Sequence, residues 1–176
     1  MKKTALITGA SKGIGRDLAH LFAKDGCNLI LVARSGKELD ILKDQLEEKY
    51  HVSVHTLIKD LSQSNSVQTV FDELKSIDID IDYLVNNAGF GDYGSFAETE
   101  WDTYEKMISL NVTTLTHFCH LFIKDIKGRK PGRILNISST AAFQPGPMMA
   151  VYFASKAFVL SFSEAIGHEL RKDNIT

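Results

Sequence analysis

Short runs of apolar residues alternate along the chain with longer segments in which apolar residues recur at helical spacing. The short runs predict five β-strands, at residues 5–7, 27–33, 52–58, 83–85 and 133–137. The longer segments predict five α-helices, at residues 16–23, 37–50, 66–77, 101–127 and 151–171. Because strand and helix alternate without repeats or a linker, residues 1–176 are expected to form one α/β domain with a doubly wound parallel sheet.

Two of the predicted helices carry further expectations. Leu18, Leu21 and Phe22 share one apolar face of the first helix. Thr99 and Asp102 have the spacing of a capping box, with Asp in place of the usual Glu. The box predicts the start of a single long helix that runs to about Lys127.

Glycines and polar residues follow the predicted strands. They are the turn Gly9–Gly15, Arg34, Asp60, Asn87 and the pair Ser138–Ser139. Core packing does not require such residues at every strand end. In a doubly wound sheet, ligands bind outside the carboxyl ends of the strands, so these residues mark the expected site.

The segment Thr8-Gly9-Ala10-Ser11-Lys12-Gly13-Ile14-Gly15 joins the first strand to the first helix. Glycines let the backbone turn tightly and lie close to a ligand. The helix directs unpaired N–H groups and the positive end of its dipole at the turn, which favours a pyrophosphate. The spacing differs from Gly-x-Gly-x-x-Gly, and no Gly-Lys-Ser/Thr follows, so a tight turn without a ligand stays open as an alternative.

Composition and charge are those of an ordinary globular protein and exclude several partners. The chain has 176 residues, 44% of them hydrophobic and 24% charged, with a net charge of −2. That balance offers no basic surface for nucleic acid or for an anionic membrane. The apolar run near Met1 ends at Thr8, too early for a signal peptide, and no run approaches the ~20 apolar residues of a membrane span. We therefore expect a cytoplasmic protein.

Cysteine and histidine usage does not favour a metal site. Cys27 and Cys119 are expected to be reduced and mostly buried thiols. His117, Cys119 and His120 lie close together in the sequence, but their spacing does not place all three on one helical face. No metal is therefore expected.

Four residues in the second half of the chain carry candidate chemistry. Tyr152 and Lys156 lie one turn apart on one face of the last helix. Ser139 follows the fifth strand, 13 residues before Tyr152. Asn111 falls inside the long fourth helix, where asparagine is mildly unfavourable unless it has a role. Taken alone, Tyr-x-x-x-Lys also arises by chance as a solvated pair on a helix.

In order and spacing, these motifs resemble those of the classical short-chain dehydrogenases/reductases, and the resemblance covers the whole chain. It rests on the glycine turn, Asn86-Asn87-Ala88-Gly89, Asn111, Ser139 and the pair Tyr152 and Lys156. The resemblance implies a Rossmann fold that binds a nicotinamide cofactor. It also implies hydride transfer between the nicotinamide and a carbonyl or carbinol carbon.

The resemblance further implies the catalytic roles. Tyr152 would donate the proton to the substrate oxygen, and Lys156 would assist it and hold the nicotinamide ribose. A free phenol ionises only near pH ~10, and a neighbouring ammonium favours the phenolate. Ser139 would hold the substrate oxygen near the tyrosine hydroxyl. Asn111 would position a water that resupplies the proton.

Cofactor contacts are implied for the glycine turn, the following strand ends and the catalytic pair. They are Gly9, Ser11, Lys12, Gly13, Ile14, Gly15, Arg34, Asp60, Leu61, Asn87, Ala88, Gly89, Tyr152 and Lys156. Asn87 and Gly89 would hold the adenosine side through backbone contacts. Asp60 would accept a hydrogen bond from the adenine amine, or it is a helix cap.

The choice of cofactor depends on the residue after the second strand. An acidic residue there would bind the ribose 2′-hydroxyl of NAD, whereas this chain has Arg34. Arginine binds a phosphate bidentately, so NADP(H) is the expected cofactor. Lys12 adds a second positive charge within the turn, unless it is a solvated loop lysine.

The substrate and the assembly are less closely defined. Apolar residues border the expected nicotinamide pocket, at Phe90, Tyr93, Phe96, Phe143, Pro145, Pro147, Met148 and Met149. They indicate an apolar carbonyl or alcohol, with loop packing or a subunit contact as the alternative. The family implies a homodimer or homotetramer that packs through the two long helices. Two other functions stay open, a nucleotide-sensing protein without efficient turnover and an epimerase or dehydratase of the family's extended branch.

The last residues carry one more expectation. Ile175 and Thr176 have the form of the first step of a sixth strand. In the family that strand continues, and a substrate-covering segment and a seventh strand follow it. We therefore expect the amino-terminal part of a longer domain that lacks the last strands, with the fifth strand as an unpaired apolar edge.

Overall fold

Five parallel strands form the sheet around which the chain is built. The computed structural model describes residues 2–128 and 131–176. The strands are β1 (Thr4–Thr8), β2 (Asn28–Ala33), β3 (Val54–Ile58), β4 (Tyr83–Asn86) and β5 (Arg133–Asn136). Their order across the sheet is β3-β2-β1-β4-β5. Because every connection is a crossover between parallel strands, the doubly wound α/β fold is confirmed.

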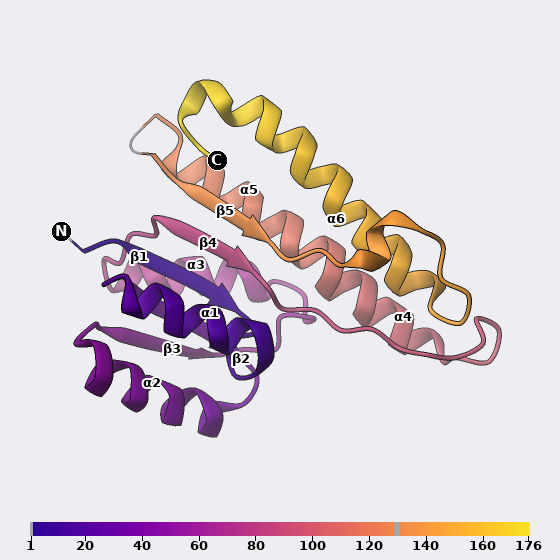
Figure 1. Cartoon of the computed structure of the whole chain (residues 1–176), viewed down its shortest axis with the longest axis horizontal. Coiled ribbons are helices and arrows are strands. Elements are labelled where there is room, and N and C mark those ends of the chain that lie inside the picture. The colour runs from indigo at the N-terminus through magenta and orange to yellow at the C-terminus, as the bar shows by residue number, and fades with distance from the viewer. Residues whose placement is uncertain (1, 129–130) are drawn as a thin grey trace.

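Helices cover both faces of the sheet (Figure 1). One face carries α1 (Gly13–Lys24) and α2 (Gly36–Tyr50). The other face carries α3 (Ser66–Ser76), α4 (Trp101–Ile108), α5 (Leu115–Ile126) and α6 (Ala150–Glu169). Short 3₁₀ helices follow β5 at Thr140–Phe143 and α6 at Leu170–Asp173.

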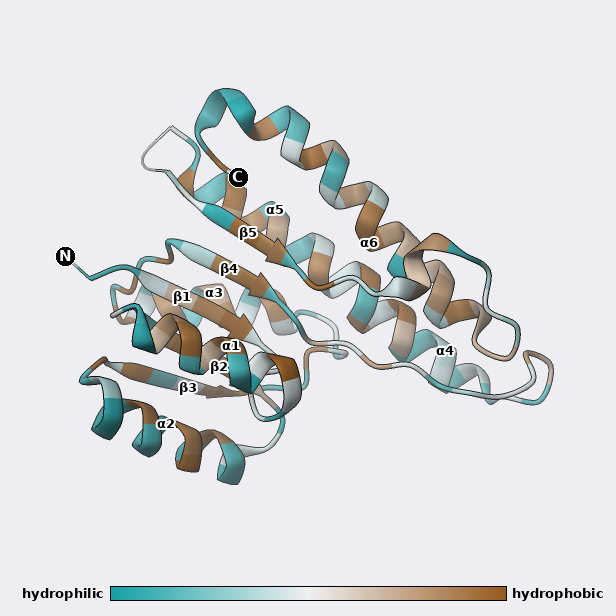
Figure 2. Ribbon diagram, viewed as in Figure 1, coloured by the Kyte–Doolittle hydropathy of each residue, from teal (hydrophilic) through white to brown (hydrophobic). Residues whose placement is uncertain are grey.

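The central strands β1 and β2 are apolar on both sides, and β1 is brown along most of its length in Figure 2, whereas β3 and β5 also carry teal segments. Alternate residues of β1 and β2 point to opposite faces, which creates two separate cores. Leu6 and Ile30 pack with α3, α5 and α6. Ile7 and Leu31 pack with α1 and α2. Burial on both faces explains why the central strands read as continuous apolar runs rather than as alternating ones.

The buried face of α1 differs from the expected one. It is formed by Gly15, Ala19 and Ala23, whereas the side chain of Leu21 is 57% exposed. A Cβ at Gly15 would lie only 2.4 Å from the carbonyl oxygen of Gly9. Because the helix approaches the β1 turn so closely, only small residues fit between helix and sheet.

The long fourth helix begins and continues differently from the prediction. Helix α4 starts at Trp101 after Glu100, and the hydroxyl of Thr99 donates to the carbonyl of Ser95 instead of capping the helix. The predicted capping box is therefore wrong. A π-helical segment, Ser109–Thr114, joins α4 to α5 without a break in direction. It centres on Asn111, and such segments occur frequently at functional sites.

The end of the chain adds to the sheet. Ile175 forms a parallel bridge to Gly132, and the N–H of Ile134 donates to the carbonyl of Thr176 at 2.7 Å. The expected start of a sixth strand is thus present. It also means that the outer edge of β5 is paired along its first residues, contrary to the expectation of an unpaired edge.

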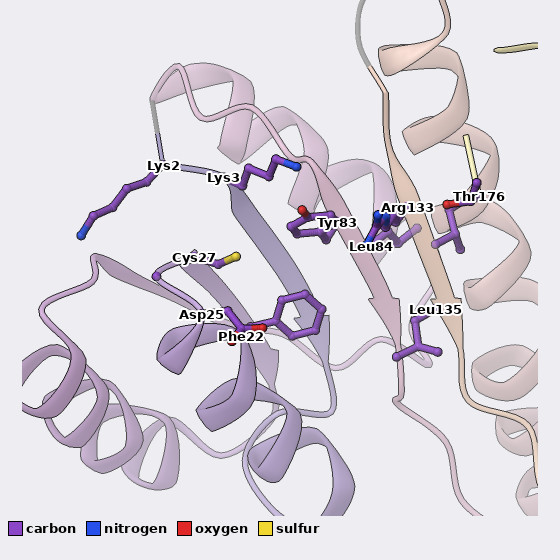
Figure 3. Close-up of a pocket in the computed structure, with 12 residues that line it drawn as sticks. Lys2, Lys3, Phe22, Asp25, Cys27, Tyr83, Leu84, Arg133, Leu135 and Thr176 are labelled. Carbon is purple, nitrogen blue, oxygen red and sulfur yellow. The ribbon is translucent and has the colours of Figure 1, made fainter. Parts of the chain in front are cut away.

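One face of β4 and β5 has no helix over it among the residues that the structure describes (Figure 1). Leu135 is 42% exposed there, although it lies in a parallel strand. A pocket of about 530 Å³ lies on this face, between the end of α1 and the starts of β4 and β5. Figure 3 shows Phe22, Tyr83 and Leu135 along it. This pocket lies toward the amino ends of the strands, away from the residues expected to carry the chemistry.

Candidate active site

The turn between β1 and α1 depends on glycines at three positions. Gly9 and Gly13 have positive φ angles of 66° and 55°, which side chains other than glycine adopt only at a cost. Gly15 has a different reason, because a Cβ there would lie 2.4 Å from the Gly9 oxygen. The turn is also bound to β2, since the N–H of Gly9 donates to Val32 at 2.8 Å.

Asn87 fastens this turn to the end of β4. Its side-chain amide donates to the carbonyls of Thr8 at 3.0 Å and Gly9 at 3.1 Å. In return, the hydroxyl of Thr8 accepts hydrogen bonds from the backbone N–H groups of Asn87 and Ala88, both at 3.0 Å. The sequence predicted a cofactor contact for Asn87 but missed this reciprocal arrangement. Thr8, buried at a strand end before a glycine, was the available signal.

The start of α1 fits a phosphate group. Its first turn contains no acidic residue, and Lys12, at the N-cap, makes no side-chain capping bond. The first backbone N–H groups of an α-helix have no partner within the helix. A Cβ at Gly13 would meet no atom within 4 Å, so the space beside the turn is open. The neighbouring residues Ser11 and Ile14 border the same turn.

The ends of β2 and β3 place a positive and a negative side chain on this side of the sheet. Arg34 follows β2 and is exposed. Asp60 follows β3, and its Oδ1 accepts from the N–H and the hydroxyl of Ser62 at 3.0 and 2.7 Å. These hydrogen bonds, led by that of the Ser62 hydroxyl, lower the pKa of Asp60, and Arg34 adds to the effect. Asp60 does not cap a helix, since α3 begins at Ser66 after Asn65.

Leu61 and Gly89 both lie against residues of the π-helical segment Ser109–Thr114. Leu61 is buried, and its carbonyl accepts from the hydroxyl of Thr114 at 2.6 Å. A Cβ at Gly89 would lie 3.0 Å from Oδ1 of Asn111 and 3.6 Å from Nζ of Lys156. Gly89 therefore lies between the cofactor side of the site and the catalytic side.

Lys156 and Tyr152 lie on the inner side of the first turns of α6. Lys156 is only 7% exposed, and its Nζ donates to the carbonyl of Ile137 at 2.9 Å. The same ammonium lies 5.9 Å from the centre of the Tyr152 ring. Burial lowers the pKa of Lys156, because the charged form loses hydration. The ammonium of Lys156 and the ring of Tyr152 therefore lie close together, as their spacing of one helical turn predicted.

The segment after β5 brings Ser139 to the same helix. The hydroxyl of Ser138 donates to the carbonyl of Lys156 at 3.0 Å, and the next residue, Ser139, begins the 3₁₀ helix that packs on α6. Oγ of Ser139 accepts from the N–H of Ala141 at 3.1 Å. A hydroxyl that already accepts this bond can still donate to a substrate oxygen.

Asn111 is buried within the π-helical segment and uses its whole side-chain amide. Oδ1 accepts from the N–H of Phe90 at 3.1 Å, and Nδ2 donates to the carbonyl of Phe90 at 2.9 Å. Nδ2 also donates to Oγ of Ser155 at 3.1 Å, and Ser155 in turn donates to the carbonyl of Tyr152. Asn111 thus connects the loop after β4 with the first turn of α6. No motif in the sequence had pointed to a role for Ser155.

The predicted site residues fall into two groups at the carboxyl edge of the sheet. The glycine turn, Arg34 and Asp60 lie at the ends of β1, β2 and β3, and the catalytic residues lie between β4, β5 and α6. Asn87 and Gly89 stand between the groups. Both groups lie at the carboxyl edge of the sheet, where a ligand of a doubly wound fold is expected to bind.

Neither a metal centre nor a membrane-spanning helix occurs among residues 2–128 and 131–176. No cluster of three or more His, Cys, Asp or Glu side chains could hold a metal there. Cys119 contacts amides instead, accepting from Nδ2 of Asn86 at 3.3 Å. No described helix has both the length and the apolar character needed to cross a bilayer.

Comparison with known proteins identifies the family. A profile described as short chain dehydrogenase matches residues 3–176, which is nearly the whole chain. The chain belongs to the short-chain dehydrogenase family. The classical resemblance drawn from the motifs is thereby confirmed.

Individual family members show how far the likeness extends. The chain is 37% identical over 176 residues to a very-long-chain 3-oxoacyl-CoA reductase of Laccaria bicolor, covering 98% of this chain and 52% of the relative. It is 33% identical to 17-beta-hydroxysteroid dehydrogenase type 3 of Mus musculus, with 99% and 57% covered. The chain thus spans about half the length of the curated relatives that it matches.

A solved structure agrees with the fold as well. The short-chain dehydrogenase from Sphingobium yanoikuyae, in complex with NADPH, superimposes with a TM-score of 0.93 at 38% identity. The match covers 98% of this chain and 67% of that protein. The relatives named above are dehydrogenases and reductases.

Proposed function

We propose that the protein is an NADP(H)-dependent oxidoreductase that interconverts an apolar carbonyl compound and its alcohol. The observation that carries the proposal is the meeting of Lys156, Tyr152 and the Ser138–Ser139 segment at the edge of the sheet. Lys156 is buried and bound to Ile137 beside that segment, at 5.9 Å from the tyrosine ring. Burying an ammonium group is costly, and such groups are typical of functional sites.

The catalytic residues would move one proton. NADP(H), when bound, supplies or accepts the hydride. Tyr152 then gives its phenolic proton to the oxygen of the substrate, while Lys156 stabilises the phenolate that remains. Ser139 holds the substrate oxygen within reach of the phenol. Asn111 fixes Phe90 and Ser155 beside this group, and we infer that a water held at its interrupted helical turn resupplies the proton.

The cofactor assignment depends on charge and on the glycine turn. The start of α1 offers backbone N–H groups to the pyrophosphate, with Gly9, Gly13 and Gly15 leaving room for it. Arg34 is placed to bind the 2′-phosphate, and the related structure from Sphingobium yanoikuyae contains NADPH. Asp60 and Leu61 would border the adenine, and Tyr152 and Lys156 the nicotinamide ribose.

An apolar substrate is supported by the side chains around Tyr152. Large apolar side chains stand exposed on the two neighbouring loops, at Phe90, Tyr93, Phe96, Phe143 and Met148. The loops are joined, since the N–H of Gly94 donates to the carbonyl of Met148 at 2.8 Å. The two curated relatives are named for a very-long-chain 3-oxoacyl-CoA and a hydroxysteroid, each of which has a large apolar part, the acyl chain in one and the steroid ring system in the other.

We further propose that the 176 residues form the amino-terminal part of a longer domain. The support is the helix-free face of β4 and β5 with its pocket of about 530 Å³, together with the half-length match to relatives. An extension of roughly 70–80 residues would complete a domain of ordinary size. We expect the extended protein to unfold at higher urea concentration and to turn over faster. Equal stability and equal turnover of both chains would refute the proposal.

The assembly and the compartment follow as lesser proposals. Helix α6 exposes Phe158, which stacks on Phe162 at 5.7 Å, and this helix with α4 and α5 would pack against a partner in a homodimer or homotetramer. Light scattering at micromolar concentration would measure the mass, and a monomer would contradict the expectation.

Cys27 and Cys119 are both free and buried, in keeping with the reducing cytoplasm.

The decisive experiment is a turnover assay with both nicotinamide cofactors. The protein is incubated with NADPH or NADH and a panel of ketones and aldehydes that runs from polar to apolar, and loss of the reduced cofactor is followed by absorbance. We expect consumption with NADPH and apolar carbonyls. Tight NADPH binding without turnover on any carbonyl would favour a nucleotide-sensing protein instead.

A further inference from the structure

Gly91, in the loop after β4, packs directly against the ring of Tyr152. A Cβ at this position would lie 2.8 Å from Cδ2, 3.0 Å from Cγ and 3.2 Å from Cε2 of that ring. The backbone itself does not require glycine there, because Gly91 is not among the residues with positive φ. The missing side chain therefore makes room for the tyrosine rather than for an unusual backbone conformation.

Hydrogen bonds on both sides of Gly91 hold its loop in place against the ring of Tyr152. The preceding residue, Phe90, is bound through both its N–H and its carbonyl to the side chain of Asn111. Three residues later, the N–H of Gly94 donates to Met148 at 2.8 Å. With the loop fixed on both sides, an added methyl group at position 91 would displace the ring of Tyr152.

The next residue of α6 has the same kind of neighbour. A Cβ at Gly146, in the loop before α6, would lie 2.3–2.5 Å from Cδ2, Cγ and Cε2 of Phe153. Gly146 also lacks a positive φ. Two adjacent aromatic rings thus each pack on a glycine from a different loop, and only the first ring carries the phenol.

We propose that Gly91 is a positioning residue that sets where the Tyr152 ring lies and so aligns its hydroxyl with the substrate oxygen. This inference rests on the proposed function. Gly91→Ala adds one methyl group and removes no proton-carrying group. A misplacement of about 1 Å can lower a rate roughly 100-fold, so kcat should fall about 10- to 100-fold while the KM for the carbonyl and the Kd for NADPH change less than about threefold.

The matched control is Gly146→Ala, which crowds Phe153 instead of Tyr152. We expect it to leave kcat within about threefold of the parent, even if it lowers stability more. In a Tyr152→Phe background, Gly91→Ala should cause no further loss of rate, because the hydroxyl that it misaligns is absent. An equal loss in the control, or the same fold loss in the Tyr152→Phe background, would overturn the proposal.

A second measurement does not depend on turnover. In protein labelled with ¹³C in its five tyrosine rings, the Tyr152 signal is identified by its disappearance in Tyr152→Phe. Gly91→Ala should shift this signal more than Gly146→Ala does, because Phe153 meets Tyr152 only edge-on, with ring centroids 6.2 Å apart. If Gly91→Ala lowers the urea midpoint, Tyr152→Ala should remove that effect by making room for the methyl group. An unmoved signal would refute the proposal, whereas a moved signal in a protein that reduces no carbonyl would refute the proposed function alone.

Discussion

The two ends of the site are built in different ways. At the cofactor end, the backbone does the positioning, with Gly9, Gly13 and Gly15 shaping a turn that has no room for a side chain at two of the three positions. At the catalytic end, side chains do the positioning, since Lys156 and Asn111 are each fixed by hydrogen bonds to backbone carbonyls. The first end is sensitive mainly to added atoms, whereas the second is sensitive to lost chemical groups and, at Gly91, to an added atom as well.

Because of this difference, substitutions at the two ends should affect stability and chemistry to different extents. A substitution in the glycine turn changes the packing of α1 on the sheet, so it reduces folding and binding together. A substitution among the side chains of α6 can leave the fold intact and remove one chemical group. Effects on rate and effects on unfolding should therefore be found at opposite ends of the same site.

The largest effect is expected at the catalytic end, from Tyr152→Phe. The change keeps the ring and removes the proton donor, so kcat should fall by about 10²- to 10⁴-fold. NADPH affinity, measured by fluorescence titration, and the urea midpoint should stay close to those of the parent. Turnover within a few-fold of the parent would remove Tyr152 from the catalytic role.

The next effect is expected at the cofactor end, from Gly15→Ala. Its Cβ would lie 2.4 Å from the Gly9 oxygen and 2.5 Å from Nδ2 of Asn87, so the free energy of unfolding should fall by about 2–3 kcal/mol. Gly167→Ala is the matched control in α6, where a Cβ meets no atom within 4 Å. There the same change should raise stability by about 0.5–1 kcal/mol. Similar urea midpoints for the two variants would show that the turn is not closely packed.

The preference between NADPH and NADH tests the proposed role of Arg34 at the cofactor end of the site. Arg34→Asp removes a phosphate partner and supplies an acceptor for a ribose hydroxyl, so NADPH affinity should fall about 10- to 100-fold and NADH affinity should rise. Arg34→Gln separates loss of charge from gain of an acid. If titration shows unchanged NADPH affinity in both variants, the phosphate lies elsewhere and Lys12 is the next residue to test.

The smallest effect concerns the buried thiol behind the catalytic end. Burial raises the pKa of Cys119 to about 12, from a model-compound value of 9.0. The unfolded chain therefore loses this proton at lower pH than the folded chain, and stability should fall above pH 9.0 by about 1.4 kcal/mol per pH unit from this group. Urea unfolding at several pH values should show a shallower fall in Cys119→Ser. An unchanged slope would mean that the thiol ionises alike in both states.

Much of the fold followed from the sequence because it depends on local patterns. The apolar runs that became β1 and β2 are buried on both faces, and a strand in that position is apolar along most of its length. In α3, Val70 and Leu74 recur at helical spacing and are buried. Candidate site residues could be named from the sequence because strand ends and residue spacing are visible in one dimension.

Contacts between distant segments could not be read in this way. The reciprocal bonds of Thr8 and Asn87 join residues 79 positions apart, and the contact of Gly91 with Tyr152 joins the loop after β4 to the first turn of α6. Nothing in the local sequence distinguishes Gly91 from a turn glycine, and the exposed Leu21 has the same helical spacing as a buried residue. The sequence by itself thus determined which segments form strands and helices and which residue types gather at the strand ends. Only the tertiary structure decided which side chains touch, because close packing depends on distances between elements that no periodicity records.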